Sequence, residues 1–429
     1  MLTRRSLPKF DIPPSEVRQP PPPRRPGKEE WNTEEEVAPF KLLVPPRVDQ
    51  AIRTFYPRRC KRKRVTTDIE SLPDELLFEV LVRIPVQDVY EARLVCRKWY
   101  HIIHTRNFIS SSLHHSTYGL LFKSVCWESV LILPQRGVGG GVEVTQLRYK
   151  RRCVVLSSCN GLWLENNLPS QDYPYVINPL TGQIVILPPC VGRVSEFKYA
   201  LAYAPASMEY KAVIFYPPDG IYRAICHMLT AGVDKTWRDI DLGLISSDAL
   251  KAFHNIPLVT EGFVHWQNPR THHVLTLNLE TETFTETPAP LLPPAIGSDR
   301  NIYLSTGKCL TLLRQYEVCL WQVWEMSRPE TGEWRKKAHF SLEAHKERFK
   351  IPGGVPNNFL TPVGWVKYPE LLAMKARDKA QMSSVFIYNL VTHEIDEIGL
   401  PTFICTYRIL VHKSSLEWLD AVKRSPSSP

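Results

Sequence analysis

One short unit recurs along most of this chain: a strand, a tight turn and a second strand. It is clearest at Tyr175–Pro188, where apolar residues lead into an Asn-Pro-Leu-Thr-Gly turn and a proline ends the second strand. Similar units begin near Tyr222, His273, Leu320 and Ser384. Their spacing of roughly 50 residues leaves room for several strands in each repeat. This pattern predicts an array of small sheets that cover one another's apolar faces.

Such an array has to close on itself or be capped, because each small sheet leaves two apolar faces exposed. The repeat length is typical of a kelch-like propeller blade, and residues 116–424 would hold about six blades. A barrel or a pair of β-sandwiches is the alternative, which the longer interval before Ser384 leaves open. The preferred prediction is a propeller-like β domain over 116–424, followed by a short tail at 425–429.

Before the repeats, apolar residues recur at helical spacing between Leu72 and Ile103. Ser71 and Asp74 resemble a capping box, Pro73 suits a first helical turn, and Pro85 ends the first helix. The first helix is expected to carry one wide apolar face of Leu76, Leu77, Val80, Leu81 and Ile84. A second helix is expected to carry Val89, Ala92, Val95, Trp99, Ile102 and Ile103 along one side.

A helical unit this small cannot bury so many large apolar groups within itself. The sequence offers neither a zinc pattern nor a disulfide framework to stabilise it. Part of its apolar surface is therefore expected to face another protein. An ordinary helical hairpin packed on the rest of the chain is the alternative.

The residues of this stretch resemble the F-box. The matching segments are Leu72-Pro73-Asp74-Glu75-Leu76, Arg83-Ile84-Pro85-Val86 and Arg93-Leu94-Val95-Cys96-Arg97-Lys98-Trp99. One departure is Gln87-Asp88, where the family often has a basic residue and a serine. The resemblance implies that residues 69–115 dock on the Skp-family adaptor of a cullin–RING ubiquitin ligase. The side chains it implies for adaptor binding are Leu72, Pro73, Leu76, Leu77, Leu81, Ile84, Pro85, Val95, Cys96 and Trp99.

The repeat region in turn resembles the F-box-associated domain of plant F-box proteins. The matching segments occur in order at Ser158–Leu162, Asn178–Gly182, Leu201–Pro205, Gly262–Trp266 and Leu275–Glu280. The kelch double-glycine signature is absent. Together the two resemblances imply an α+β multidomain protein, with a small helical F-box followed by an all-β, propeller-like domain. Substrate-binding residues vary too much in this family to be transferred, so the target protein stays unidentified.

The first 68 residues differ from the rest in composition. They contain twelve prolines, with sixteen Lys and Arg against nine Asp and Glu, which predicts a disordered basic tail. The tail ends in a basic cluster formed by Arg58, Arg59, Lys61, Arg62, Lys63 and Arg64. This cluster predicts nuclear import, with the cytoplasm as the second compartment considered. A solvated linker is the alternative reading of the same cluster.

The sequence carries no recognisable catalytic or metal-binding motif. There is no C-x-x-C, G-x-S-x-G or H-E-x-x-H. The pairs His114-His115 and His272-His273 are adjacent, and adjacent residues on a strand point to opposite faces. No apolar run is long enough to span a bilayer. We therefore expect a soluble, intracellular protein that is no enzyme, binds neither metal nor cofactor, and has no membrane partner.

The preferred function is that of a substrate receptor in an SCF-type ubiquitin ligase. The F-box would bind the adaptor, and the β domain would hold a target protein near the ubiquitin-loaded enzyme. A second hypothesis is a nuclear scaffold or nucleic-acid cofactor acting through the basic tail. Most of the formal net charge of +9 lies in that tail, so nucleic-acid binding by the β domain is disfavoured. A third hypothesis is a propeller that binds a carbohydrate or metabolite.

Overall fold

The computed structural model describes most of the 429-residue chain from Leu72 onward. The described ranges are 72–123, 128–136, 142–150, 153–167, 174–189, 198–216, 224–243, 245–268, 273–290, 300–317, 319–346, 360–377, 383–398 and 409–417. The predicted disordered tail and its basic cluster lie outside these ranges. Within them, no helix is long and apolar enough to cross a membrane.

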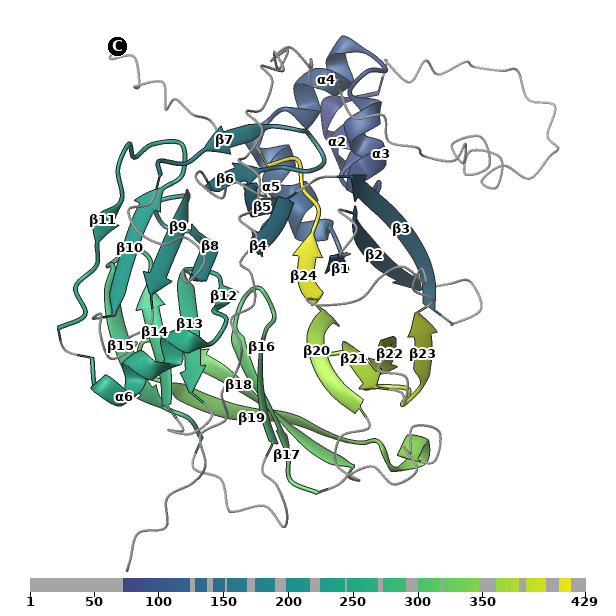
Figure 1. Ribbon diagram of the computed structural model, residues 1–429. Coiled ribbons are helices and arrows are strands. Elements are labelled where there is room, and N and C mark those ends of the chain that lie inside the picture. The colour runs from purple at the N-terminus through teal and green to yellow at the C-terminus, as the bar shows by residue number, and fades with distance from the viewer. Residues whose placement is uncertain are drawn as a thin grey trace, which may run out of the picture. The chain divides into compact units, whose positions relative to one another are not determined.

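The described chain begins with four helices: α2 (Asp74–Leu81), α3 (Val86–Ala92), α4 (Arg97–Ile103) and α5 (Arg106–His115) (Figure 1). Pro73 and Pro85 stand directly before α2 and α3. A proline lacks a backbone N–H, and at the start of a helix that N–H would have no acceptor within the helix, so nothing is lost. The prediction of helical structure over the F-box-like stretch is thus confirmed. A further helix, α5, follows Ile103.

The single second helix expected from Val89 to Ile103 is wrong. The N–H groups of Leu94 and Val95 donate to carbonyls three residues back, which tightens the last turn of α3 and ends it. Cys96 is then extended, with φ −158° and ψ 168°, and α4 starts after it. The adjacent His114 and His115 lie in the last turn of α5, so the strand argument applied to them does not hold.

The strands of the described β domain form six four-stranded antiparallel sheets, which we call blades 1 to 6. The strands of each blade are named from the inner to the outer strand. Blade 1 contains β24 (Ile409–Lys413), β1 (Tyr118–Lys123), β2 (Glu128–Arg136) and β3 (Val142–Lys150). Blade 2 contains β4 (Cys153–Cys159), β5 (Leu162–Asn167), β6 (Pro174–Ile177) and β7 (Ile184–Ile186), and blade 3 contains β8 (Lys198–Ala204), β9 (Glu209–Tyr216), β10 (Ile225–Thr230) and β11 (Arg238–Asp239). Blade 4 contains β12 (Leu258–Thr260), β13 (Phe263–Asn268), β14 (His273–Asn278) and β15 (Thr283–Pro288); blade 5 contains β16 (Arg300–Ser305), β17 (Leu310–Gln315), β18 (Leu320–Arg328) and β19 (Glu333–Ser341); and blade 6 contains β20 (Leu360–Lys367), β21 (Leu371–Arg377), β22 (Ser383–Asn389) and β23 (Ile395–Ile398). Short helical turns lie outside the sheets as α6 (Ser247–Leu250), η3 (Lys251–His254) and η4 (Glu343–His345).

The blades close into a ring (Figure 1). The inner strands of successive blades contact one another from β4 through β8, β12, β16 and β20 to β24, and β24 contacts β4. Blade 1 takes its inner strand from the C-terminal part of the chain, because β24 pairs with β1 from Tyr118↔Lys413 to Phe122↔Ile409. The predicted fold class, a small helical domain followed by an all-β propeller, is therefore confirmed. The five recurring hairpins of the sequence are the third and fourth strands of blades 2 to 6.

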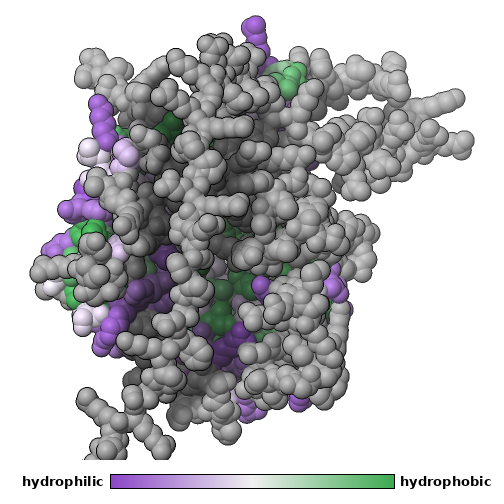
Figure 2. All heavy atoms as spheres, viewed as in Figure 1, coloured by the Kyte–Doolittle hydropathy of each residue, from purple (hydrophilic) through white to green (hydrophobic). Residues whose placement is uncertain are grey.

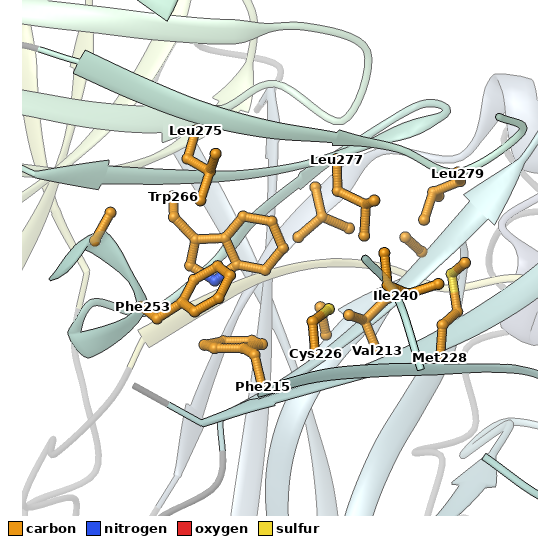
Figure 3. Close-up of a cluster of buried hydrophobic side chains, with 14 of the residues drawn as sticks. Val213, Phe215, Cys226, Met228, Ile240, Phe253, Trp266, Leu275, Leu277 and Leu279 are labelled. Atoms are coloured by element: carbon orange, nitrogen blue, oxygen red, sulfur yellow. The ribbon is translucent and has the colours of Figure 1, made fainter. Parts of the chain in front are cut away.

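Neighbouring blades are held together mainly by buried apolar side chains. Figure 3 shows the cluster between blades 3 and 4, where Trp266 packs edge-on against Phe215 and Phe253, with ring centroids 5.0 and 5.1 Å away. Trp321 is buried in the cluster between blades 5 and 6, and Trp324 packs on the opposite face of β18. These two tryptophans therefore pack against different neighbouring blades.

The turns between the third and fourth strands of blades 2, 4 and 6 share one structure. Asn178, Asn278 and Asn389 each end a third strand, and each side-chain oxygen accepts from the N–H groups two and three residues later. Four residues after the asparagine, the backbone turns into the left-handed region, at Gly182 (φ 76°) and Glu282 (φ 56°). The same local hydrogen bonds therefore build this turn in three blades.

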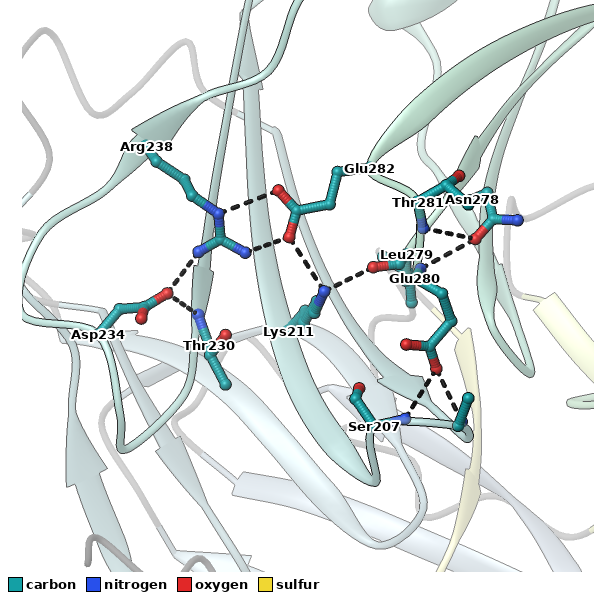
Figure 4. A network of polar contacts seen from close by, with 11 residues as sticks. Ser207, Lys211, Thr230, Asp234, Arg238, Asn278, Leu279, Glu280, Thr281 and Glu282 are labelled. Atoms are coloured by element: carbon teal, nitrogen blue, oxygen red, sulfur yellow. Dashed lines mark hydrogen bonds and ion pairs between the residues drawn. The ribbon is translucent and has the colours of Figure 1, made fainter. Parts of the chain in front are cut away.

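The turn at Glu282 also joins blade 4 to blade 3 (Figure 4). Lys211 donates to the Leu279 carbonyl at 2.6 Å and to Glu282 at 3.0 Å, and Arg238 Nε donates to Glu282 at 3.0 Å. Arg238 also pairs with Asp234. Hydrogen bonds from Arg238, and then from Lys211, hold the pKa of the Glu282 carboxyl below its usual range. This ionised cluster is accounted for by its role in joining two blades.

Candidate partner-docking site on the helices

The F-box-like helices expose several large apolar side chains to solvent. Leu76 and Val80 lie one turn apart on α2 and are each 55% exposed. Leu94 and Val95 lie in the turn between α3 and α4 and are 72% and 60% exposed. Figure 2 shows hydrophobic side chains on the surface where Figure 1 places these helices. Exposed apolar side chains that lie close together on a soluble protein commonly mark a protein-binding surface.

The rest of the apolar set forms the core of the helical domain. Leu77 and Leu81 are 1% and 0% exposed, and further buried side chains come from α3, α4 and α5, including Val89, Ile103 and Phe108. Phe78 of α2 stacks edge-on against Phe108 of α5, with ring centroids 5.3 Å apart. The wide apolar face expected on α2 is therefore two stripes, one buried and one exposed.

Polar contacts fix the exposed turn relative to the start of α2. Lys98, in the first turn of α4, pairs with Asp74 at 2.9 Å and donates to the Leu72 carbonyl at 2.5 Å. These contacts place the Arg93–Cys96 turn beside the first turn of α2, which carries Leu76. The guanidinium of Arg93 lies 3.7 Å from the ring centre of Tyr90, on the other side of the turn. The first turn of α4, directly after the exposed turn, is thus tied to the start of α2.

The predicted adaptor-binding residues fall into three groups in the structure. Exposed are Pro73, Leu76, Pro85 and Val95; half-buried are Leu72, Ile84, Cys96 and Trp99; buried are Leu77 and Leu81. Ile84 lies beyond the end of α2, which stops at Leu81. Sequence reasoning missed Val80 and Leu94 as exposed positions, although the spacing of Val80 from Leu76 was a usable signal.

Among the described residues, no group of three or more His, Cys, Asp and Glu side chains could hold a metal ion. The described cysteines Cys96, Cys159, Cys226, Cys309 and Cys319 are all free thiols. Burial raises the pKa of the Cys159 thiol to about 12, so the unreactive thiol is strongly favoured over the thiolate there.

Comparison with known protein families finds the same two parts, a helical domain followed by a propeller. Residues 69–111 match the F-box domain, and residues 110–407 match the F-box associated beta propeller domain. The second match spans well over half of the chain. This chain therefore belongs to the family of proteins that carry an F-box and an F-box-associated propeller.

Related F-box proteins occur in plants. An F-box protein of Arabidopsis thaliana is 24% identical over 304 residues, covering 66% of this chain and 82% of the relative. A putative F-box protein of the same plant is 22% identical over 374 residues, covering 82% of this chain and 99% of the relative. Among solved structures, a chain of a nidogen/laminin complex aligns with 69% of this chain and 99% of its own length, at 12% identity and a TM-score of 0.39. Members of the F-box families generally act as substrate receptors of SCF-type ligases and are typically non-catalytic.

Proposed function

We propose that this protein is the substrate receptor of an SCF-type ubiquitin ligase, with the Skp-family adaptor bound to its F-box helices. The observation that supports this most is the exposure of Leu76, Val80, Leu94 and Val95 within a folded helical domain. A surface of this kind is unfavourable in water and becomes favourable when a partner covers it. The F-box match over residues 69–111 supports the adaptor as that partner.

In this role the chain performs no chemistry of its own. The F-box attaches the chain to the ligase, and the propeller binds the target protein. When the target lysine is held near the ubiquitin thioester, their reaction becomes effectively intramolecular. The effective concentration of the reacting groups is therefore raised. A closed ring of blades suits this task because it leaves only short sheet edges and keeps its binding faces rigid.

Affinity purification under proteasome inhibition tests the proposal. We expect the intact chain to bring down the Skp-family adaptor and a cullin, and a chain lacking residues 72–115 to bring down neither. Target proteins should remain associated with the deleted chain, because the propeller is unchanged. Recovery of the cullin with the deleted chain, or its absence from the intact chain, would contradict the proposed role.

We also propose that the basic cluster Arg58–Arg64 directs the protein to the nucleus. The support is its six basic residues within seven positions, in a proline-rich tail that contains few large apolar groups. Replacing the six basic residues by alanine should abolish nuclear accumulation, whereas a variant that exchanges each Arg for Lys and each Lys for Arg should retain it. Fluorescence microscopy of tagged chains measures both. Unchanged localisation of the alanine variant would show that the cluster is only a linker.

A further inference from the structure

The inner strands of the propeller surround a cavity of about 1280 Å³. At one end, the turns that follow the inner strands of blades 3, 4 and 5 are joined to one another. The N–H of Gly262 donates to the Tyr203 carbonyl at 3.0 Å, and the N–H of Glu261 donates to the Gly307 carbonyl at 2.8 Å. We call this end of the cavity the rim. Backbone hydrogen bonds between blades make the rim a preformed structure.

Blade 1 completes the rim where the two ends of the domain meet. Tyr118 opens β1 and lies directly opposite Lys413 of β24. A side chain at Gly307 would place its Cβ 2.0 Å from the Tyr118 hydroxyl, and the φ of Gly307 is +86°. Only glycine can therefore bring the blade 5 turn this close to Tyr118. Lys308, the next residue of that turn, lines the same cavity as Lys413.

The two lysines at the rim hold positive charge without a neutralising partner. In the described part of the chain, no carboxylate forms an ion pair with Lys413 or Lys308. The Lys413 ammonium donates to the His114 carbonyl at 3.5 Å and lies 5.1 Å from the ring centre of Tyr118. Burial, and then the charge of Lys308, lower the pKa of Lys413 to about 8. The folded protein thus holds the partly desolvated Lys413 within the electric field of the exposed Lys308.

Other charged groups also line this cavity. Burial, and then the charges of Glu417 and Glu261, raise the pKa of Tyr203, while Arg106 of α5 opposes them. Glu261 also contributes, after burial, to the raised pKa of Tyr118. Neither carboxylate is among the groups that shift the pKa of Lys413, so the effect of Lys308 on Lys413 is not offset by them.

We propose that Lys413 and Lys308, together with the hydroxyl of Tyr118, bind a phosphate group at this rim. An anion between the two ammonium groups removes their repulsion and gains charge-assisted hydrogen bonds in a site of reduced dielectric. The cavity is far larger than a phosphate ion, so it accommodates the organic part of a phosphate monoester. That monoester is either a small metabolite or a phosphorylated side chain of a protein. The inference is independent of the ubiquitin-ligase role.

Calorimetric titration of the full chain with inorganic phosphate is the first test. We expect measurable binding, with Lys413→Met and Lys308→Met each weakening it by about tenfold or more. The matched control is Lys251→Met, because Lys251 is exposed, pairs with Asp248 at 2.6 Å and lies away from the cavity lining. It should bind phosphate as the wild type does. No binding by the wild type, or equal losses in all three variants, would overturn the proposal.

A second readout follows from the titration of Lys413. At pH 8 about half of its ammonium groups are deprotonated, so a bound anion should draw in up to about half a proton per site. Calorimetry in two buffers of different ionisation enthalpy measures this uptake. Lys413→Arg should keep phosphate binding but lose the uptake, because arginine stays charged. Binding without proton uptake in the wild type would place the anion elsewhere.

Two further experiments test whether the variants fold and which kind of phosphate compound binds. Melting curves without phosphate check each variant, and if Lys413→Met does not fold, the exposed Lys308→Met decides the outcome. Glycerol phosphate and a phosphoserine peptide are then compared with inorganic phosphate. Tighter binding of the first indicates a metabolite, and tighter binding of the second indicates a phosphorylated protein. An affinity for both no greater than for inorganic phosphate would overturn the phosphate-monoester assignment.

Discussion

Replacing Leu94 and Val95 together by aspartate is expected to weaken adaptor binding by about a hundredfold or more without lowering the melting temperature. Both side chains are mostly exposed, at 72% and 60%, so the folded chain loses little when they change. Each would contribute roughly 1.5–3 kcal/mol once a partner buries it. Losing both contributions, and forcing the burial of two carboxylates, accounts for a change of this size. The measurement is the affinity of the full chain for purified adaptor, alongside thermal melting.

Two control variants make this prediction specific. Val391→Asp changes an apolar residue of similar exposure, 73%, on a turn of blade 6, and adaptor affinity should not change. Leu77→Ala removes a buried side chain and should lower the free energy of unfolding by about 2–5 kcal/mol together with binding. If Leu94→Asp/Val95→Asp binds as tightly as the wild type, the exposed turn is not the docking surface. An equal loss in Val391→Asp would point to a non-specific charge effect.

Stability is expected to fall steeply as the pH is lowered from 7 to 5, because of two buried histidines. Burial lowers the pKa of both His265 and His412 from 6.5 to about 3. In the folded protein both rings therefore stay neutral, whereas the unfolded chain binds their protons below pH 6.5. Stability is thus fully present above pH 6.5 and is lost as the pH falls towards 3. At pH 5 the loss is about 2 kcal/mol for each histidine.

The two rings differ in their contacts, which suggests a matched pair of variants. Both ring nitrogens of His265 contact threonine hydroxyls, of Thr260 and Thr276, at 2.9 Å. His412 lies on the closing strand β24 and accepts from Trp163 Nε1 of blade 2 at 2.9 Å. His265→Gln and His412→Gln should each be less stable at pH 7 but lose about 2 kcal/mol less than the wild type between pH 7 and 5.

Urea unfolding at the two pH values measures all three proteins. Carboxyls whose pKa is lowered in the folded state, such as Glu282, lose their contribution mainly below about pH 4.5, so the chosen window isolates the histidines. A wild type equally stable at pH 7 and 5 would show that these rings are protonated, or accessible, in the folded state. Variants with the wild-type slope would assign the loss to other groups.

Much of the fold could be predicted because its signals are local. The turns after Asn178, Asn278 and Asn389 are each built by hydrogen bonds between residues at most four apart. Such turns, flanked by apolar strands, made the hairpins recognisable, and their roughly 50-residue period indicated a propeller of about six blades. Pro73 likewise marked the start of the first helix, since proline acts within its own helical turn, and Pro85, predicted as the stop of that helix, stands directly before the next one.

The docking surface was predicted only in part. The sequence showed that the F-box-like stretch has more apolar side chains than it can bury, but Leu76 and Leu77 look alike in it. Their exposures of 55% and 1% depend on contacts with residues far along the chain, such as those that bring α5 against α2. The break between α3 and α4 was missed because the apolar spacing continues across it. The spacing of apolar residues predicts which side chains a helix could bury. Whether the helix continues through those residues depends on tertiary packing.

By itself, then, the sequence predicted the small helical unit, the positions of the five hairpins and a propeller of about six blades, with a barrel or a pair of sandwiches as the alternative. The tertiary structure alone decided which leucines of α2 stay exposed, how β24 closes the ring against β1, and that Lys413 and Lys308 line one cavity beside Tyr118. The physical reason is range. Hairpins, caps and turns are set by interactions within a few residues. The exposure of the leucines depends on packing between helices, such as that of Phe78 against Phe108, and ring closure joins residues nearly the whole length of the propeller apart.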